Sequence, residues 1–408
     1  MLAFRFRHFL NYWSNSLWSA SLPSSLLRLR DLLQHEILAN RLLKSDVSGD
    51  HLKLNYPLQS TGSTAELLSA NAMQDSSISD MIPGNDRNSS SDYVEALSLL
   101  KNNPPEQRLD IPMPYSRYLQ LEDSWSKFKS ENDISEEMRS PSLSYNSLMQ
   151  IATVVTTQSA LHDNTGAVFR DIIASSVNEY LSLHEPGKIP NIKNFASTTM
   201  TRPGPSGWSS KEPDHSFVYS RRGFVPQLQV AIECGVSENY NALCRDKDLW
   251  IQQMGAEVVI LICLNEIPHY QSPRVAYNIE DKVGDIRKMS QHATEAMENN
   301  MKQDNYGPVK YRGHNWLGKL ETLFVEVWRA NGQIPDRKWL IRHGHTSPLS
   351  RSIGLRVRDF FPETEWAVCK IPDSDVPFDG GRLQLDVEEA IKSTAIERFC
   401  RFLWSRQA

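Results

Sequence analysis

Two acidic residues and one lysine stand out because their types and spacing suit chemistry on a phosphate ester. Asp214 comes shortly before a predicted strand at 217–219, and Glu233 lies near the end of the next predicted strand, 228–236. Lys247 follows in the helix predicted after that strand. In the second strand apolar and other residues alternate, which is typical of a strand with one face packed on a core. Two neighbouring strands and a covering helix would bring the three side chains together.

Those three groups are what a metal-dependent phosphodiesterase requires. Mg²⁺ keeps several waters and usually takes one or two protein carboxylates. The metal lowers the pKa of a bound water and stabilises charge on phosphate oxygens, and a nearby ammonium can neutralise the charge that develops. We therefore expect Asp214 and Glu233 to bind Mg²⁺ (or Mn²⁺) and Lys247 to act on the water or the phosphate.

Lys247 falls within the apolar stripe of its helix. At 100° per residue it lies near the middle of that stripe, while Asp246 and Asp248 lie away from it, on the expected solvated face. The stripe consists of Tyr240, Leu243, Cys244, Ile251 and Met254. A lysine facing a sheet is costly to bury unless an acid or a phosphate meets it. The alternative is that its stem lies along the apolar face with the ammonium in water.

The same residues resemble a known family. Pro213 and Asp214, a spacer, and the segment from Pro226 to Glu233 resemble the signature of the PD-(D/E)XK restriction-endonuclease-like superfamily, in particular its bacterial Uma branch and related uncharacterised fungal proteins. The chain departs from the parent motif at Gly235, where a lysine is expected. The resemblance covers about residues 170–265 and implies a restriction-endonuclease-like core, a mixed central sheet flanked by helices.

The resemblance also implies a site. The two acids would bind the metal, with the backbone carbonyl of Cys234 as an extra ligand, and Lys247 would be the lysine displaced onto the next helix. An acid from the preceding helix, Glu179 or Asp171, would join them. The function implied is metal-dependent hydrolysis of nucleic-acid phosphodiester bonds. Because Gly235 replaces the motif lysine, the alternative is a catalytically degenerate nuclease fold that acts as a nucleic-acid or protein interaction module.

The elements that would position this site predict an α/β fold. The periodicity of apolar residues predicts helices at 148–159, 168–183, 238–254, 285–301 and 386–402, and strands at 217–219, 228–236, 257–264, 275–277, 309–311 and 323–328. The polar segment 203–210, which contains glycine and proline, is expected to be a connection. A motif at 340–346 mimics that of histidine phosphatases, but no second histidine follows His345, so we interpret it as accidental.

Composition shifts divide the chain into four regions. We expect an N-terminal amphipathic or targeting segment at 1–45, a largely disordered linker at 46–140, the nuclease-like domain at 141–335 and a C-terminal extension with a terminal helix at 336–408. The first acid in the chain is Asp31, and the arginine- and serine-rich stretch before it is typical of mitochondrial import. The expected location is intracellular, either nuclear or cytoplasmic, with mitochondrial import as an alternative.

Overall composition excludes several classes of protein. The net charge of −5 over 408 residues gives no global nucleic-acid signature, so a nucleic-acid site must be a local surface. No apolar run is long enough to span a membrane. The five cysteines show no C-x-x-C spacing, which favours a reduced compartment. The ten tryptophans are scattered along the sequence, which does not indicate a platform for stacking bases. The pattern leaves the oligomeric state and the choice between DNA and RNA open.

Overall fold

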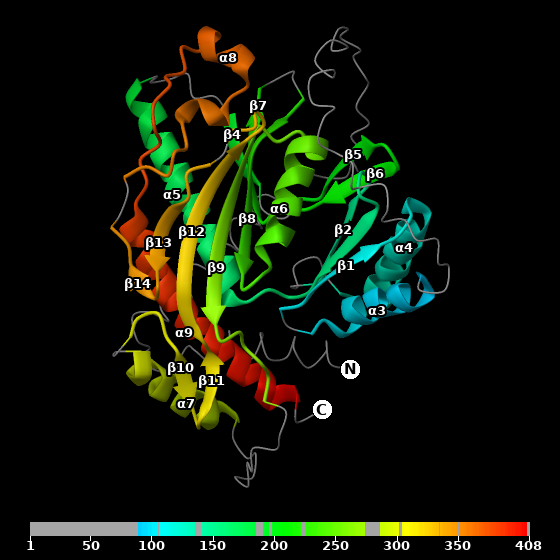
Figure 1. The fold of residues 1–408 in the computed structure, drawn as a ribbon, viewed down its shortest axis with the longest axis vertical. Coiled ribbons are helices and arrows are strands. Elements are labelled where there is room, and N and C mark those ends of the chain that lie inside the picture. The colour runs from blue at the N-terminus through cyan, green and yellow to red at the C-terminus, as the bar shows by residue number, and fades with distance from the viewer. Residues whose placement is uncertain are drawn as a thin grey trace, which may run out of the picture. The chain divides into compact units, whose positions relative to one another are not determined.

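The computed structural model describes residues 89–405, except for 105, 135–139, 185–190, 196–197, 222–224, 274–285, 302–303, 334 and 349–350. All of the described residues belong to one compact unit, Arg87–Ala408. The expectations for the segment 1–45 and for a strand at 275–277 lie outside the described residues. The architecture is α/β, with mixed sheets and flanking helices (Figure 1).

A seven-stranded sheet forms the centre of the fold, in the order β14-β13-β12-β9-β8-β7-β4. Its strands are β4 (Asn191–Phe195), β7 (His215–Ser220), β8 (Gln227–Val236), β9 (Val258–Ile267), β12 (Lys319–Arg329), β13 (Lys338–Arg342) and β14 (His345–Thr346). Only β8 and β9 pair in parallel among these described strands. The predicted strands 217–219, 228–236, 257–264 and 323–328 are therefore confirmed.

The parallel pair is joined through a helical crossover that covers one face of the sheet. Helix α6 (Tyr240–Leu249) begins after Asn239, whose side chain accepts a hydrogen bond from the Asn241 N–H. It continues as a π-helical turn, η1 (Trp250–Met254), and ends at Gly255, which has a φ of 74°. Glycine adopts this left-handed conformation without strain. The helix predicted at 238–254 is thus confirmed as two consecutive helical segments.

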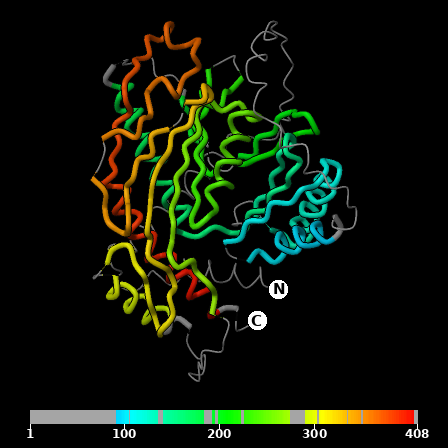
Figure 2. Tube along the Cα trace, in the orientation of Figure 1, coloured from blue at the N-terminus to red at the C-terminus, as the bar shows by residue number. Residues whose placement is uncertain are grey.

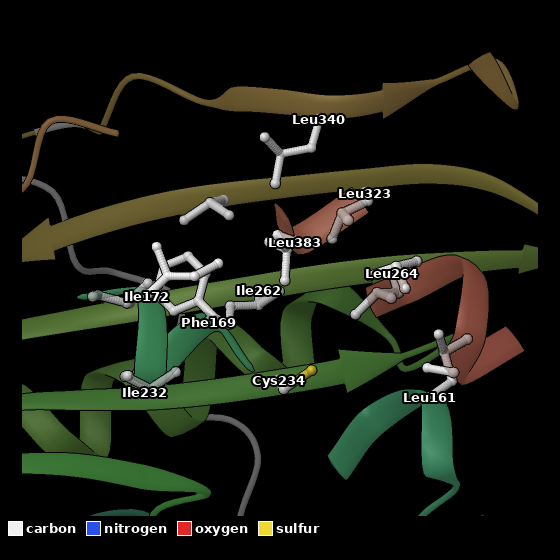
Figure 3. Packing of buried hydrophobic residues seen from close by; sticks show 14 of the residues in the cluster. Leu161, Phe169, Ile172, Ile232, Cys234, Ile262, Leu264, Leu323, Leu340 and Leu383 are labelled. Carbon is white, nitrogen blue, oxygen red and sulfur yellow. The ribbon is translucent and has the colours of Figure 1, made fainter. Parts of the chain in front are cut away.

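Two long helices cover the opposite face. Helix α5 (Ala160–His184) and helix α9 (Gly380–Ser405) contact each other and pack on the same side of the sheet (Figure 2). Figure 3 shows side chains from α5, β8, β9, β12, β13 and α9 gathered in this core. The helices predicted at 168–183 and 386–402 are confirmed, each longer than expected.

Smaller elements complete this layer. Helix α7 (Ile286–Met301) packs near the hairpin of β10 (Val309–Tyr311) and β11 (His314–Leu317), and η2 (Val357–Phe360) and α8 (Glu363–Val368) precede α9. The predicted helix 285–301 and strand 309–311 are confirmed. The motif at 340–346 forms the β13–β14 hairpin, where His343 and Gly344 both have positive φ. The motif therefore forms a hairpin turn, and such turns need residues that adopt a positive φ, such as glycine.

A second sheet has five strands in the order β1-β3-β2-β6-β5, and β4 of the large sheet lies between its β3 and β5 in the sequence. Its strands are β1 (Arg108–Pro112), β2 (Ser142–Asn146), β3 (Ile151–Val155), β5 (Met200–Gly204) and β6 (Gly207–Lys211), and helices α3 (Ser89–Asn102) and α4 (Tyr115–Glu131) share a core with it. We call it the small sheet. In Figure 1 it lies on the side of the large sheet that carries α6.

The small sheet corrects three expectations. The predicted helix at 148–159 is wrong, because its apolar residues are the β-branched run of β3, paired on both sides. The segment 203–210 is mostly strand, not a connection. Within 46–140, the described residues from 89 onward form α3, β1 and α4, which bury apolar residues against β2 and β3, so they are not a disordered linker. Among the described residues, no helix is long and apolar enough to cross a membrane.

Candidate functional site

The two predicted acids lie next to each other on neighbouring strands. His215 pairs with Ile232 in the antiparallel β7–β8 ladder, which places Asp214 and Glu233 at the next opposed position. Asp214 is held by the strand itself, because the backbone N–H of Cys234 donates to its Oδ2 over 2.7 Å. The Asp214 carboxylate is close enough to Glu233 to raise the pKa of that group, and a metal ion shared by the two carboxylates stays a prediction.

Glu233 lies on the face of β8 that α6 covers. Its Oε1 accepts a hydrogen bond from the indole N–H of Trp250, the first residue of the π-helical turn. The ammonium of Lys211 lies 3.5 Å from the same oxygen. Both Glu233 and Lys211 are buried. The contact joins the large sheet, which carries the acid, to the last residue of β6 in the small sheet.

Lys211 also contacts Asp246 on α6, with Nζ 3.1 Å from Oδ2. Arg108 of β1 forms a fork on the same carboxylate, with Nη1 at 2.7 Å and Nη2 at 3.0 Å. Its Nη1 further donates to Glu238 over 2.6 Å. A bidentate arginine–carboxylate pair is geometrically specific, so this network fixes α6 against the small sheet.

The charges in this network shift one another's pKa. Burial raises the pKa of Glu233 to about 8; the Lys211 ammonium lowers it, and the carboxylates of Asp214 and Asp246 raise it. Burial alone would also raise the pKa of Asp246, but Lys211 and Arg108 outweigh it and lower that pKa to about 2. The site therefore holds Asp246 as a carboxylate and favours the protonated form of Glu233. Bringing a further cation to Glu233 would remove that proton.

Helix α5 contributes to the other side of Asp214. His162 is buried, with Nε2 3.3 Å from Asp214 Oδ2 and Nδ1 3.1 Å from Asp163 Oδ1. Burial lowers the pKa of His162, but Asp214 and Asp163 outweigh it and leave the pKa well above its usual value. An imidazolium here lowers the pKa of Asp214 despite that group's burial. Asp214 is thus kept ionised.

His215 is buried beside this group but does not share its charge. Its Nδ1 lies 3.4 Å from Nη1 of Arg170 on α5. Burial and the Arg170 guanidinium lower the pKa of His215 to about 4. The imidazole is neutral at physiological pH, as a neighbour of the site rather than a cation within it.

The structure does not bring Lys247 to the two acids. Its ammonium lies 2.6 Å from Asp248 and 4.2 Å from the ring centroid of Trp328 on β12. The helical wheel placed Lys247 towards the site and Asp246 towards solvent, because it took no account of the small sheet. The cations of the small sheet meet Asp246 and bury it, so a position expected to face solvent faces the site. The lysine that does approach Glu233 is Lys211.

Gly235 explains why the motif lysine is missing from β8. A Cβ at this position would lie 2.6 Å from Cδ1 of Leu243 and 3.0 Å from Oε2 of Glu238. Helix α6 therefore packs directly on the strand backbone at this point. A lysine side chain has no room here, and the ammonium near Glu233 comes from another strand.

The other predicted ligands have different places. Asp171 accepts hydrogen bonds from its neighbour Arg170, and Glu179 is exposed on α5. The side chain of α5 that meets Asp214 is His162, about two turns before Asp171. Cys234 lies beside Glu233, with its N–H on Asp214, and its carbonyl remains a predicted ligand. Within the described ranges, no group of three or more His, Cys, Asp or Glu side chains could hold a metal ion.

Sequence reasoning missed Lys211 and Arg108. Lys211 stands only three residues before Asp214, and that proximity was the available signal. The sequence does not indicate a role for Lys211, because the segment 203–210 before it is predicted to be a connection rather than the strand β6. Arg108 precedes the site by more than a hundred residues, and the sequence around it does not indicate a role. Its position beside Asp246 depends on the pairing of β1 with β3.

Comparison with known proteins adds no relative to this geometry. No family model matches the chain, and no curated protein matches it.

Proposed function

We propose that this protein is a metal-dependent nuclease of the restriction-endonuclease-like class, with Asp214 and Glu233 as metal ligands and Lys211 as the lysine of the site. The observation that carries the proposal is the approach of three groups from separate strands. Asp214 directly precedes β7, Glu233 lies on the neighbouring strand β8, and the Lys211 ammonium lies 3.5 Å from Glu233.

The donor set fits a hard divalent cation such as Mg²⁺ or Mn²⁺. The hydrogen bonds and ion pairs of the two acids use Oδ2 of Asp214 and Oε1 of Glu233, so each has a second oxygen to offer. Mg²⁺ takes one or two protein carboxylates and completes its shell with waters, so a two-acid site suffices. Burial and two neighbouring carboxylates raise the pKa of Glu233, and a bound cation would lower it. When bound, the metal would activate a water and stabilise charge on the phosphate.

The chain's own groups would then have separate tasks. The Cys234 N–H and His162 hold Asp214 in place and ionised. Asp246 and Glu233 hold the Lys211 ammonium between them, where it can stabilise developing negative charge. Trp250 fixes the orientation of Glu233 from α6.

A second function has an observation in its favour. Glu233 is buried beside Lys211, Asp214 lies beside His162, and Gly235 replaces the motif lysine. These features are expected of a catalytically degenerate nuclease fold. In that case the network only fastens the small sheet to the large one, and the protein is a nucleic-acid or protein interaction module.

Nuclease activity of the full chain separates the two. The full chain is needed, because a fragment that began after α4 would lack β1 and the Arg108 that pairs with Asp246. Purified protein would be given DNA and RNA, single- and double-stranded, with Mg²⁺, Mn²⁺ or EDTA. Metal-dependent cleavage that Asp214→Asn and Glu233→Gln each abolish, with melting temperatures near that of the wild type, supports the nuclease. Folded wild-type protein that cleaves none of these substrates assigns the fold to the interaction module.

A further inference from the structure

Three cations and several aromatic rings meet where α6 adjoins β12 and β13. We call Trp328, Trp339, Arg337, Arg342 and Lys247 the aromatic–cation surface. The two tryptophans are distant from Lys247 in sequence, and the scatter of tryptophans along the chain gave no reason to expect a stacking platform. The β12–β13 pairing and the α6 crossover bring them to one face of the sheet.

The rings and cations alternate across this surface. Lys247 Nζ lies 4.2 Å from the centroid of the Trp328 ring, and Arg342 Cζ lies 5.3 Å from that of Trp339. Arg337 Cζ lies between, 3.9 Å from the Phe324 ring and 5.5 Å from Trp339. These distances are within the range of cation–π contacts. Trp328 and Trp339 are partly exposed, so each ring has an accessible portion.

One of the three cations is internally neutralised. Arg337 donates to the buried Glu326 over 2.7 Å, and Glu326 also accepts hydrogen bonds from Tyr240 and Trp328. This carboxylate therefore orients the Trp328 ring and fixes the Arg337 side chain as part of the framework. The other two cations are Arg342, which is exposed, and Lys247, whose side chain is only 12% exposed beside the Trp328 ring.

Arg342 is the better exposed of these two. It is exposed at the end of β13, and within the described part of the chain its partner is the Trp339 ring rather than a carboxylate. Lys247 shares its charge with Asp248, whose side chain is 47% exposed. A cation held over a ring and not fully neutralised suits a phosphate group beside a stacked base.

We propose that the aromatic–cation surface binds single-stranded nucleic acid. Bases of a single strand can stack on partly exposed rings because their faces are free, and interleaved cations contact the phosphates. A duplex hides its base faces, so this pattern favours the single strand. The inference rests on the proposed function, since it gives that nuclease its substrate class. Asp246 and Lys247 are consecutive on α6 and face the buried site and the surface respectively.

Binding is measured without cleavage, so that the two proposals are tested separately. Full-length protein in EDTA would be titrated into fluorescently labelled strands of about 20 nucleotides, longer than a typical single-strand site, and into the matching duplex, with anisotropy as the readout. The variants are the double substitution Arg342→Gln with Lys247→Gln, and Trp339→Leu, which keeps an apolar side chain against Phe324.

The matched control removes one arginine and one lysine from the opposite face. Arg382 and Lys392 lie on α9 with side chains 50% and 30% exposed, and Arg382→Gln with Lys392→Gln should leave binding unchanged. We expect the wild type to bind the single strand more tightly than the duplex. The Arg342/Lys247 variant should bind about tenfold more weakly, with the slope of log affinity against log salt reduced by about 1.4. Trp339→Leu should weaken binding about tenfold with the slope unchanged.

Duplex affinity equal to or above single-strand affinity, undetectable single-strand binding, or surface variants that bind like the wild type would each overturn the inference. Asp214→Asn serves to separate it from the nuclease proposal, because that variant should bind normally and fail to cleave. If the wild type binds single strands through this surface but cleaves nothing, the nuclease proposal fails and the binding surface stands. If the wild type cleaves and the surface variants change neither binding nor cleavage, only the surface is refuted.

Discussion

The ammonium of Lys211 lies 3.5 Å from Oε1 of Glu233, although the two residues belong to different sheets. Lys211 ends β6 and Glu233 lies near the end of β8. The chain passes from one sheet to the other through the short segment that contains Asp214. One crossing between the sheets thus positions Lys211, Asp214 and Glu233. The lysine comes from β6, not from the strand or helix in which the sequence motif predicts it.

Replacing Lys211 should abolish cleavage, whereas replacing Lys247 should not. Lys211→Met removes the ammonium beside Glu233, and loss of a preorganised charge stabiliser costs about 100-fold or more in turnover. Lys247→Met removes a cation whose contacts are Asp248 and Trp328, so turnover of a short substrate at saturation should change less than about threefold. Single-turnover rates at saturating Mg²⁺ measure both, with thermal melting to show that each variant folds. The reverse ranking would return the catalytic role to Lys247.

The contribution of Glu233 to the stability of the metal-free protein should fall between pH 4.5 and about 8. The folded protein keeps the Glu233 proton up to about pH 8, whereas the unfolded chain loses it near 4.5. Because the folded state binds more protons in this window, the contribution is complete below pH 4.5 and is lost as the pH rises towards 8. The slope approaches about 1.4 kcal/mol per pH unit for one proton.

Urea denaturation in EDTA at a series of pH values measures this slope. Glu233→Gln is the matched comparison, because its amide stays neutral and similar in shape at every pH. The free energy of unfolding of the wild type minus that of Glu233→Gln should fall as the pH rises from 4.5 towards 8. Parallel profiles for the two proteins would show that Glu233 does not titrate with a raised pKa.

The four strands β7, β8, β9 and β12 of the large sheet could be predicted because their signals are local, whereas β4, β13 and β14 were not predicted. The alternation in 228–236 and the β-branched run of 257–264 lie in single segments, and each forms the expected strand, β8 and β9. The two acids were predictable for the same reason, since adjacent antiparallel strands must oppose them. The lysine was not, because its position depends on a sheet whose strands β5 and β6 are short and polar. A helical wheel of α6 could not show that Asp246 faces that sheet.

Gly235 should not tolerate the lysine that the parent motif expects. A Cβ there would lie 2.6 Å from Leu243 Cδ1, so Gly235→Lys forces α6 away from β8. We expect a loss of stability of about 1–3 kcal/mol, as overpacking typically costs, measured by urea denaturation. Gly235→Ala should lose less, because only the Cβ must fit. Recovery of cleavage in a Lys211→Met protein by adding Gly235→Lys would contradict this packing argument and show that the strand can still host the lysine.

Arg108 should contribute more to folding than an arginine in an exposed ion pair. Its fork on Asp246 is largely shielded, with side chains 15% and 9% exposed, and it ties α6 to β1. Arg108→Met leaves Asp246 with Lys211 as its remaining cation, and breaking a buried pair from one side costs about 3 kcal/mol. Arg356→Met is the matched control, because Arg356 pairs with Asp373 in the open, where the side chains are 54% and 41% exposed. That substitution should cost about 0–1 kcal/mol. Equal urea midpoints for the two variants would mean that the small sheet is not held to α6 through this pair, and the positioning of Lys211 beside Glu233 would then rest on β6 alone.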